Sequence, residues 1–156
     1  MDEIVAKALA KWPDVPAVYG WLSLDRRGNW RIKEERVGNA ALREFIARNY
    51  ARDSGGSWFF QNGPQRVFVR LAYTPLIVRT REASFVDQCG RAFESAGAML
   101  DNEGSVLLLG GGGVALLDDR DLAAYADARE EALQALPRIE SRDVADRFGF
   151  IPEPKP

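Results

Sequence analysis

The stretch from residue 57 to residue 72 reads SWFFQNGPQRVFVRLA, and this pattern decides the expected fold. An Asn-Gly-Pro turn signal at residues 62–64 separates two runs of aromatic and β-branched residues. Such a signal between two such runs is typical of a β-hairpin. Alternation along the returning run puts Arg66, Phe68 and Arg70 on one face and Val67, Val69 and Leu71 on the other. We therefore predict two antiparallel strands that share an aromatic and basic face.

Similar signals recur on both sides of this hairpin. Turn residues at 26–29, 101–104 and 110–113 lie between apolar or alternating runs, and they predict hairpins over about 18–33, 98–109 and 106–117. Pro75 is tolerated at the first position of a further strand over 76–79. Residues 81–97 are ambiguous, because Ser84 and Asp87 have the spacing of a helix cap but Gly90 would interrupt a helix. Extended structure is favoured there.

Two longer segments have the apolar spacing of helices. One opens at Asn39, a suitable N-cap, and extends to about residue 52; the other begins at Asp118 or Asp119 and extends to about residue 136. Shorter helices are predicted near 3–11 and 141–148. The predicted fold class is α+β, a mainly antiparallel sheet of about seven or eight strands built from hairpins and packed by the helices near 40–52 and 119–136.

Length and charge bound the domain organisation. The chain has 156 residues, which fits one α+β domain over 1–150, followed by an extended tail without fixed structure at 151–156. Residues 1–81 contain 14 Lys and Arg against 8 Asp and Glu, whereas residues 82–156 contain 7 against 15. A basic half (1–81) and an acidic half (82–150) are therefore conceivable. They indicate either an anionic partner or attraction between the halves, within one chain or across a dimer.

Missing residue types exclude several classes of site. The chain has no histidine and one cysteine, Cys89, so it has no Ser-His-Asp or Cys-His catalytic site and no His-bearing or four-cysteine metal site. The lone Cys89 indicates a reducing compartment, the cytoplasm, and a small buried residue rather than a nucleophile. No apolar run reaches the roughly 18 to 20 residues of a membrane span. No cofactor, metal or catalytic residue is predicted, and enzyme activity is left open with non-enzymatic binding favoured.

Three patterns are candidates for chemistry. The run Gly110–Gly113 formally fits a dinucleotide fingerprint, but no helix begins after it, and a hairpin between two buried strands is favoured. The aspartates Asp118, Asp119 and Asp121 have the residue type for a metal site or a hydrolase, but they cluster at a predicted helix start, and helix capping is favoured. The candidate anion- or ligand-binding residues are Arg66, Phe68, Arg70, Arg79 and Arg81, because sheet surfaces hold single-stranded nucleic acid with such side chains. The other interpretation, that the rings are core and the arginines extend over them, is the favoured one for this pattern taken alone.

One short pattern occurs twice. Residues 24–32 and 100–108 share Leu-Asp-x-x-Gly followed by alternating apolar residues. A duplicated hairpin–helix unit would produce this, but Asp-x-x-Gly is also a common hairpin turn, and the turn interpretation is favoured.

Stretches at 19–28 (YGWLSLDRRG), 58–67 (WFFQNGPQRV) and 116–122 (LLDDRDL) resemble an uncharacterised proteobacterial family of unknown function. The resemblance covers most of the chain. It implies a bacterial cytosolic protein without an assigned activity, and it supplies no catalytic residues.

These observations favour a non-enzymatic binding or interaction module with no membrane association. Its partner is left unknown, and the candidates are an anionic ligand, a nucleic acid or a second copy of the chain. Two alternatives stay open. The first is a small carboxylate-dependent enzyme such as a hydrolase, and the second is a self-associating structural protein that forms a homodimer.

Overall fold

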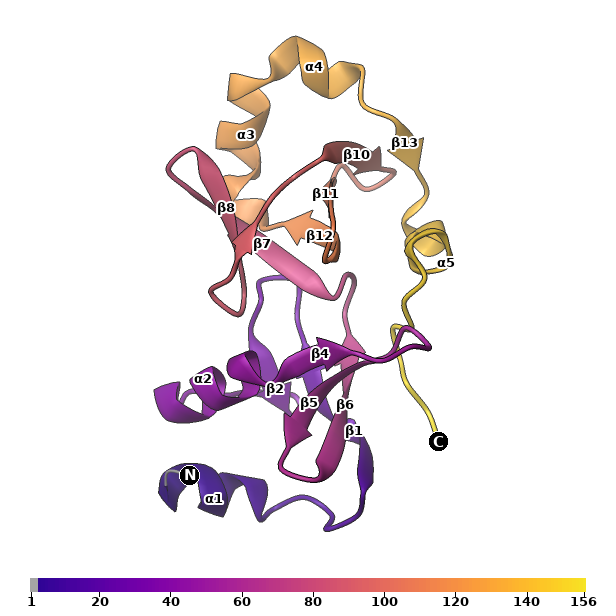
Figure 1. Cartoon of the computed structure of the whole chain (residues 1–156). Coiled ribbons are helices and arrows are strands. Elements are labelled where there is room, and N and C mark those ends of the chain that lie inside the picture. Colours follow the sequence, from indigo (N-terminus) through magenta and orange to yellow (C-terminus); the bar gives the residue numbers. More distant parts are fainter. Residues whose placement is uncertain (1–2) are drawn as a thin grey trace. The chain divides into compact units, whose positions relative to one another are not determined.

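The computed structural model describes residues 3–156, which form two compact units (Figure 1). The first unit comprises the described residues up to Asp25, with Asn29–Ala72 and Phe150–Pro156; the second comprises Arg26–Gly28 and Tyr73–Gly149. The units divide at Ala72 and Tyr73, whereas the change in charge near residue 81 lies inside a hairpin of the second unit.

The first unit is a six-stranded sheet with two helices. Its elements are α1 (Glu3–Leu9), β1 (Ala17–Leu24), β2 (Trp30–Ile32), β3 (Glu35–Arg36), α2 (Ala40–Arg48), β4 (Tyr50–Arg52), β5 (Trp58–Asn62) and β6 (Gln65–Leu71). The strand order is β3-β2-β1-β6-β5-β4, so two antiparallel meanders, β1 to β3 and β4 to β6, join through the parallel pair β1 and β6. The hairpin predicted over residues 57–72 is confirmed as β5 and β6.

Helix α2 covers one face of this sheet. Phe45 of α2 meets Phe60 of β5 edge-on, with ring centroids 5.3 Å apart, and Phe60 pairs in register with Val67. Phe60 and Val67 are fully buried, so the core of the unit lies between α2 and the face of the sheet that carries these two side chains. Asn39 is the N-cap, as predicted, and its side chain accepts a hydrogen bond from the Leu42 amide. The helix ends at Arg48 rather than near residue 52, because the following residues pair with β5 as β4.

The second unit contains a seven-stranded sheet. Its strands are β7 (Leu76–Arg81), β8 (Ser84–Asp87), β9 (Ala92–Phe93), β10 (Gly97–Asp101), β11 (Val106–Gly110), β12 (Gly113–Leu117) and β13 (Arg138–Ile139). Its helices are η1 (Asp119–Asp121, 3₁₀), α3 (Leu122–Ala128), α4 (Glu130–Gln134), η2 (Ser141–Asp143, 3₁₀) and α5 (Val144–Phe148). The strand order is β13-β10-β11-β12-β7-β8-β9, with β7 and β12 parallel and β13 parallel to β10. Two meanders joined by a parallel pair therefore recur in both units.

Four hairpin loops share one construction. They begin at Asp25, Asp53, Asp87 and Asp101, and each has glycine three residues later with φ between 78° and 92°. In each loop the aspartate amide donates to the carbonyl of the residue four positions on. The amide of that residue donates back to the aspartate Oδ1. A non-glycine residue is strained at such φ values, which explains the fixed glycine. The sequence pattern that residues 24–32 and 100–108 share is thus explained by this loop construction. The loops that begin at Asp53 and Asp87 have the same construction.

The α+β class and the mainly antiparallel pairing are confirmed, and residues 3–156 form 13 strands in two mixed sheets instead of about seven or eight in one. Extended structure within 81–97 is also confirmed, as β8 and β9. The predicted helix over 119–136 is interrupted at Arg129, whose φ of −133° and ψ of 32° separate α3 from α4. In the part of the chain that the structure describes, no helix is long and apolar enough to cross a membrane.

Candidate functional site

The face of the first sheet opposite to α2 carries rings and guanidinium groups. Phe59 and Phe68 are paired in register across β5 and β6, one position away from the helix-covered pair Phe60 and Val67. They therefore point to the other side of the sheet. Alternation adds further side chains on this side, and we call the whole set the ring face: Tyr19, Trp21, Phe59, Arg66, Phe68 and Arg70.

A bulge in β1 brings Tyr19 onto Phe68. The register between β1 and β6 shifts between Val18 and Leu22, where Gly20 has a φ of 77°. Extra residues in one strand redirect side chains, and glycine accepts the positive φ that this bulge requires. The rings of Tyr19 and Phe68 stack with centroids 4.8 Å apart and planes 8° from parallel. Both residues are half-buried.

Cations lie over or beside these rings. The Arg66 guanidinium carbon is 4.3 Å from the centroid of the Phe59 ring, and the Lys33 ammonium is 4.2 Å from that of Trp21. Arg70 forms an ion pair with Glu34. Among residues 3–156, no carboxylate pairs with Arg66, which is exposed. Arg66 therefore has its charge available for a ligand, while the charge of Arg70 is already neutralised.

The five predicted ligand-binding residues do not form one cluster. Arg66, Phe68 and Arg70 lie on the ring face of the first unit, whereas Arg79 and Arg81 end β7 in the second unit. Arg79 donates two hydrogen bonds to Asp121, at 2.8 and 3.2 Å. Arg81 is exposed, and no carboxylate in the described chain pairs with it. The site predicted from alternation therefore reduces to its three members on β6.

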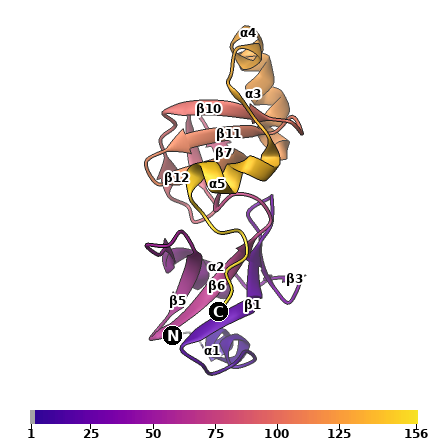
Figure 2. The same cartoon turned by 90° about the vertical axis from the view of Figure 1, so that its right-hand side faces the viewer.

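The C-terminal segment lies on the same side of the first sheet as the ring face. Figures 1 and 2 show α2 on one side of the first sheet and residues 151–156 on the other, across β6 and β1. The segment is attached at its start: the Ile151 amide donates to the Gly56 carbonyl at 2.9 Å, and the Leu71 amide donates to the Pro152 carbonyl at 2.7 Å. Pro154 is buried, although both of its neighbours are exposed. The alternating prolines of IPEPKP were the only sequence signal of this segment, and they do not indicate where it docks.

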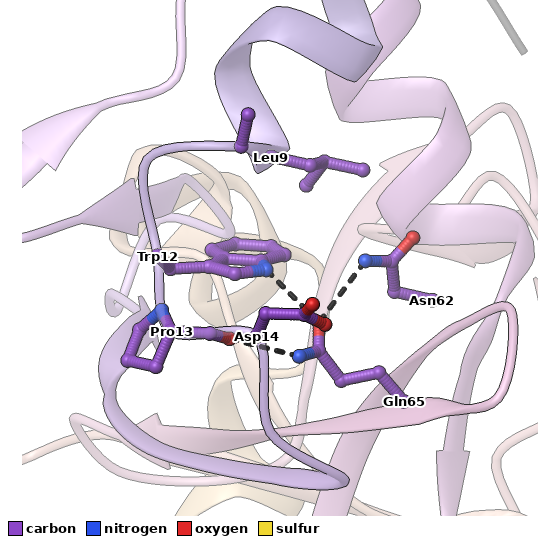
Figure 3. A pocket seen from close by; sticks show the side chains of 7 residues that line it. Leu9, Trp12, Pro13, Asp14, Asn62 and Gln65 are labelled. Carbon is purple, nitrogen blue, oxygen red and sulfur yellow. Dashed lines mark hydrogen bonds between the residues drawn. The ribbon is translucent and has the colours of Figure 1, made fainter.

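A pocket of about 320 Å³ lies at the opposite end of β6 from this attachment, beside the loop that follows α1 (Figure 3). Gln65 closes it: its Oε1 accepts from Trp12 Nε1 and Asn62 Nδ2, and its Nε2 donates to the carbonyls of Pro13 and Val15. All hydrogen-bonding positions of the amide are thus used within the protein. Gln65, which sequence reasoning missed, fixes the loop to β6 and has no free group for a ligand.

The aspartates of the hydrolase alternative are caps and ion-pair partners. Asp118 is fully buried and accepts hydrogen bonds from the backbone and side chain of Arg120, while Asp121 accepts from Arg79. Burial by itself raises the pKa of Asp118, but the hydrogen bonds from Arg120 outweigh burial and lower it below its ordinary value. The hydrogen bond from Arg79 likewise lowers the pKa of Asp121. A general acid needs a raised pKa, and neither Asp118 nor Asp121 has one.

The remaining sequence candidates are structural features. Cys89 is half-buried, and burial raises the pKa of its thiol to about 12, which suppresses the reactive thiolate. The glycine run is a hairpin in which Gly110 pairs with Gly113, as predicted. A Cβ at Gly110 would lie 2.8 Å from the Glu94 carbonyl oxygen, so this glycine permits close packing. Within residues 3–156, no three side chains of the metal-ligating types lie close enough to hold an ion.

Comparison with known proteins identifies the family. A family model with the description "Protein of unknown function (DUF2946)" matches residues 1–155. The chain belongs to this family, DUF2944. The resemblance noted in the sequence, to an uncharacterised family, is thereby confirmed, and membership of DUF2944 assigns no function. No curated protein matches the chain.

Two crystal structures of DUF1285 family proteins are similar to this DUF2944 chain. The protein from Shewanella baltica OS155 has 14% sequence identity and a TM-score of 0.51, over 68% of this chain and 90% of that one. The protein from Silicibacter pomeroyi DSS-3 has 14% identity and a TM-score of 0.56, over 81% and 84%. At this identity the similarity shows a shared fold and nothing about a site.

Proposed function

We propose that this chain is a non-enzymatic binding module of the bacterial cytoplasm, and that the ring face holds an extended, acidic peptide. One observation carries the proposal: Arg66, without a carboxylate partner in the described chain, lies beside the stacked rings of Tyr19 and Phe68. The single Cys89, which is not in a disulfide, supports the cytoplasmic location.

The combination of groups suits a chain-like ligand. Stacked rings offer a flat apolar surface, on which a peptide can pack without losing hydrogen bonds to water. A guanidinium group binds a carboxylate with two parallel hydrogen bonds, which fixes the position of an acidic side chain. Together they select an extended segment with one acidic residue close to apolar ones.

A peptide fits this face better than a nucleic acid. Binding of nucleic acid relies on many contacts between cations and phosphates along the backbone. On this face Arg70 is neutralised by Glu34, and Arg31 is paired with Asp25. Arg66 supplies a guanidinium for one carboxylate, Lys33 over the Trp21 ring supplies a second cation, and this side of the sheet already carries a peptide segment of the same chain.

The proposal can be tested by nuclear magnetic resonance on the intact protein. Addition of the acetylated peptide Pro-Glu-Pro-Glu-Pro should shift the amide resonances of Tyr19, Trp21 and Phe68. The substitution Arg66→Gln should weaken binding about 10-fold, the loss expected for one charge-assisted contact. Arg81→Gln is the matched control, since it removes an exposed arginine of the other unit, and it should leave the affinity unchanged.

The same titration with a (dT)12 oligonucleotide separates the alternatives. Shifts of the ring-face amides with (dT)12 and not with the peptide, falling steeply as salt is added, would transfer the site to nucleic acid. Shifts with neither probe, in wild type and in the Pro154→Ser variant introduced below, would reject the ring face as a binding site.

A further inference from the structure

We infer that residues 151–156, which we call the strap, act as a built-in competitor for the ring face, and that the peptide bound there in its place contains alternating prolines. This inference rests on the proposed function. It adds the chemistry of the partner and a mode of regulation to the same site.

The first argument is the position of the strap. It crosses β6 and β1 on the side of the sheet opposite to α2, the side to which Tyr19, Phe68 and Arg66 point (Figure 2). Tyr19 and Phe68 are half-buried, although they lie on the side away from the helix. Pro154 is the buried residue in the middle of the strap. A ligand that uses these rings must therefore displace this part of the strap.

The second argument is the chemistry of the strap. Prolines at 152, 154 and 156 favour an extended conformation, so that little conformational entropy is lost when the strap docks. Proline has no backbone N–H, so these residues place no unpaired donor against a face of rings. Proline-rich segments dock on aromatic surfaces in several recognition domains for these reasons. Glu153 makes the strap acidic at one position, although it forms no ion pair with Arg66 among the described residues.

The third argument is how the strap is held. Both main-chain hydrogen bonds that tie it to the sheet lie at its start, at Ile151 and Pro152, and the isolated bridge between Ser57 and Ile151 lies there too. Beyond Pro152 the burial of Pro154 is the remaining attachment that the described residues show. Residues 153–156 can therefore leave the ring face while the first two residues stay anchored.

Competition within one chain lowers the apparent affinity for a partner. A segment tethered beside its site is present at an effective concentration on the order of millimolar. If the strap covers the face about 90% of the time, the apparent Kd for an external peptide rises about 10-fold. The strap thus prevents weak ligands from binding to the ring face, whereas a peptide that binds the face more tightly than the strap displaces it.

The test uses three full-length proteins and one probe, a fluorescein-labelled peptide with the sequence of residues 150–156, measured by fluorescence anisotropy. The substitution Pro154→Ser removes the buried proline and keeps the anchor at residues 151–152. Pro156→Ser makes the same chemical change at an exposed position and is the matched control. We expect the Pro154→Ser protein to bind the probe about 10-fold more tightly than the wild type and the Pro156→Ser protein.

The outcomes distinguish the inference from the function on which it rests. If all three proteins bind equally and Arg66→Gln weakens each of them, the ring face binds peptides and the strap does not compete. If none binds, the proposed function itself fails. A second measurement uses the wild type, so that it does not depend on whether the variant folds. A saturating amount of unlabelled probe should move the amide resonances of Glu153 and Lys155 to random-coil positions. Unmoved resonances with bound probe would overturn the inference.

Discussion

The two units have the same strand arrangement, and Arg66 of the first and Arg79 of the second, both on strands, differ in whether a carboxylate neutralises them. In the second unit, Arg79 and Arg120 are paired with Asp121 and Asp118, two carboxylates that sit where a strand passes into a helix. In the first unit, Arg66 lies over the ring of Phe59 and has no carboxylate partner in the described chain. The exposure of an arginine therefore does not indicate a binding role. What separates the two cases is whether the same unit places an acid within reach.

The shared hairpin loops give a second contrast between the units. Asp53 in the first unit is half-buried, and its side chain accepts hydrogen bonds from the Gly55 and Ser57 amides. Asp101 in the second unit is only 3% exposed, and its side chain accepts from the amides of Glu103 and Ser105 and from the Tyr73 hydroxyl at 2.7 Å. The loop should therefore contribute more to the free energy of unfolding at Asp101, where water cannot replace its hydrogen bonds, than at Asp53.

The largest expected effect follows from this contrast. Asp101→Ala leaves the buried Tyr73 hydroxyl without its acceptor and removes the acceptor of two part-buried loop amides, and it should lower the free energy of unfolding by about 3 kcal/mol. Asp53→Ala is the matched control and should cost about 1 kcal/mol, because water reaches its loop. Urea denaturation followed by circular dichroism measures both. Equal losses would show that burial does not distinguish the loops.

A second prediction uses pH to measure the ion pair of the second unit. Asp118→Asn keeps a capping side chain but removes the charge that Arg120 binds, and it should cost about 2 kcal/mol at pH 7. The pKa of Asp118 is lowered in the folded protein, so its charge contributes stability above the ordinary value near 4 and loses that contribution as the pH falls through the lowered pKa.

The difference in unfolding free energy between wild type and Asp118→Asn should therefore be constant from about pH 5 to 8 and shrink below about pH 4. Asp119→Asn is the control, since Asp119 is exposed where Asp118 is fully buried. A difference that persists unchanged at pH 2.5 would mean that the capping geometry, and not the charge, stabilises this corner.

Local features of the sequence predicted the local features of the structure. Asn62-Gly63 specified the β5–β6 hairpin, and Asn39 specified the start of α2, because both signals act within four residues. The end of α2 was predicted too late, since the pairing of Tyr50 with Phe60 depends on a strand that follows it. Helical periodicity across Arg129 likewise did not reveal the break between α3 and α4.

The candidate site depended more on distant residues. Alternation correctly put Arg66, Phe68 and Arg70 on one face, but it could not show that Arg79 meets Asp121, 42 residues further on. Nor could it show that Tyr19 reaches Phe68 through a bulge, or that residues 151–156 return to the sheet of residues 17–71. Each of these contacts depends on how distant segments are arranged in the fold, so the sequence near either residue does not predict it.

The smallest expected effect tests the contrast between arginines directly. Arg79→Gln removes an ion pair whose carboxylate is largely buried, and it should lower the free energy of unfolding by about 1 kcal/mol without changing peptide binding. Arg66→Gln should change stability by less than about 0.5 kcal/mol, because Arg66 itself is exposed and forms no ion pair among the described residues, while it weakens binding. Arg79→Gln should thus lower stability and leave peptide affinity unchanged, whereas Arg66→Gln should lower peptide affinity and leave stability nearly unchanged. If Arg66→Gln proved the more destabilising of the two, its guanidinium would be part of the fold, and the distinction between the two units would collapse.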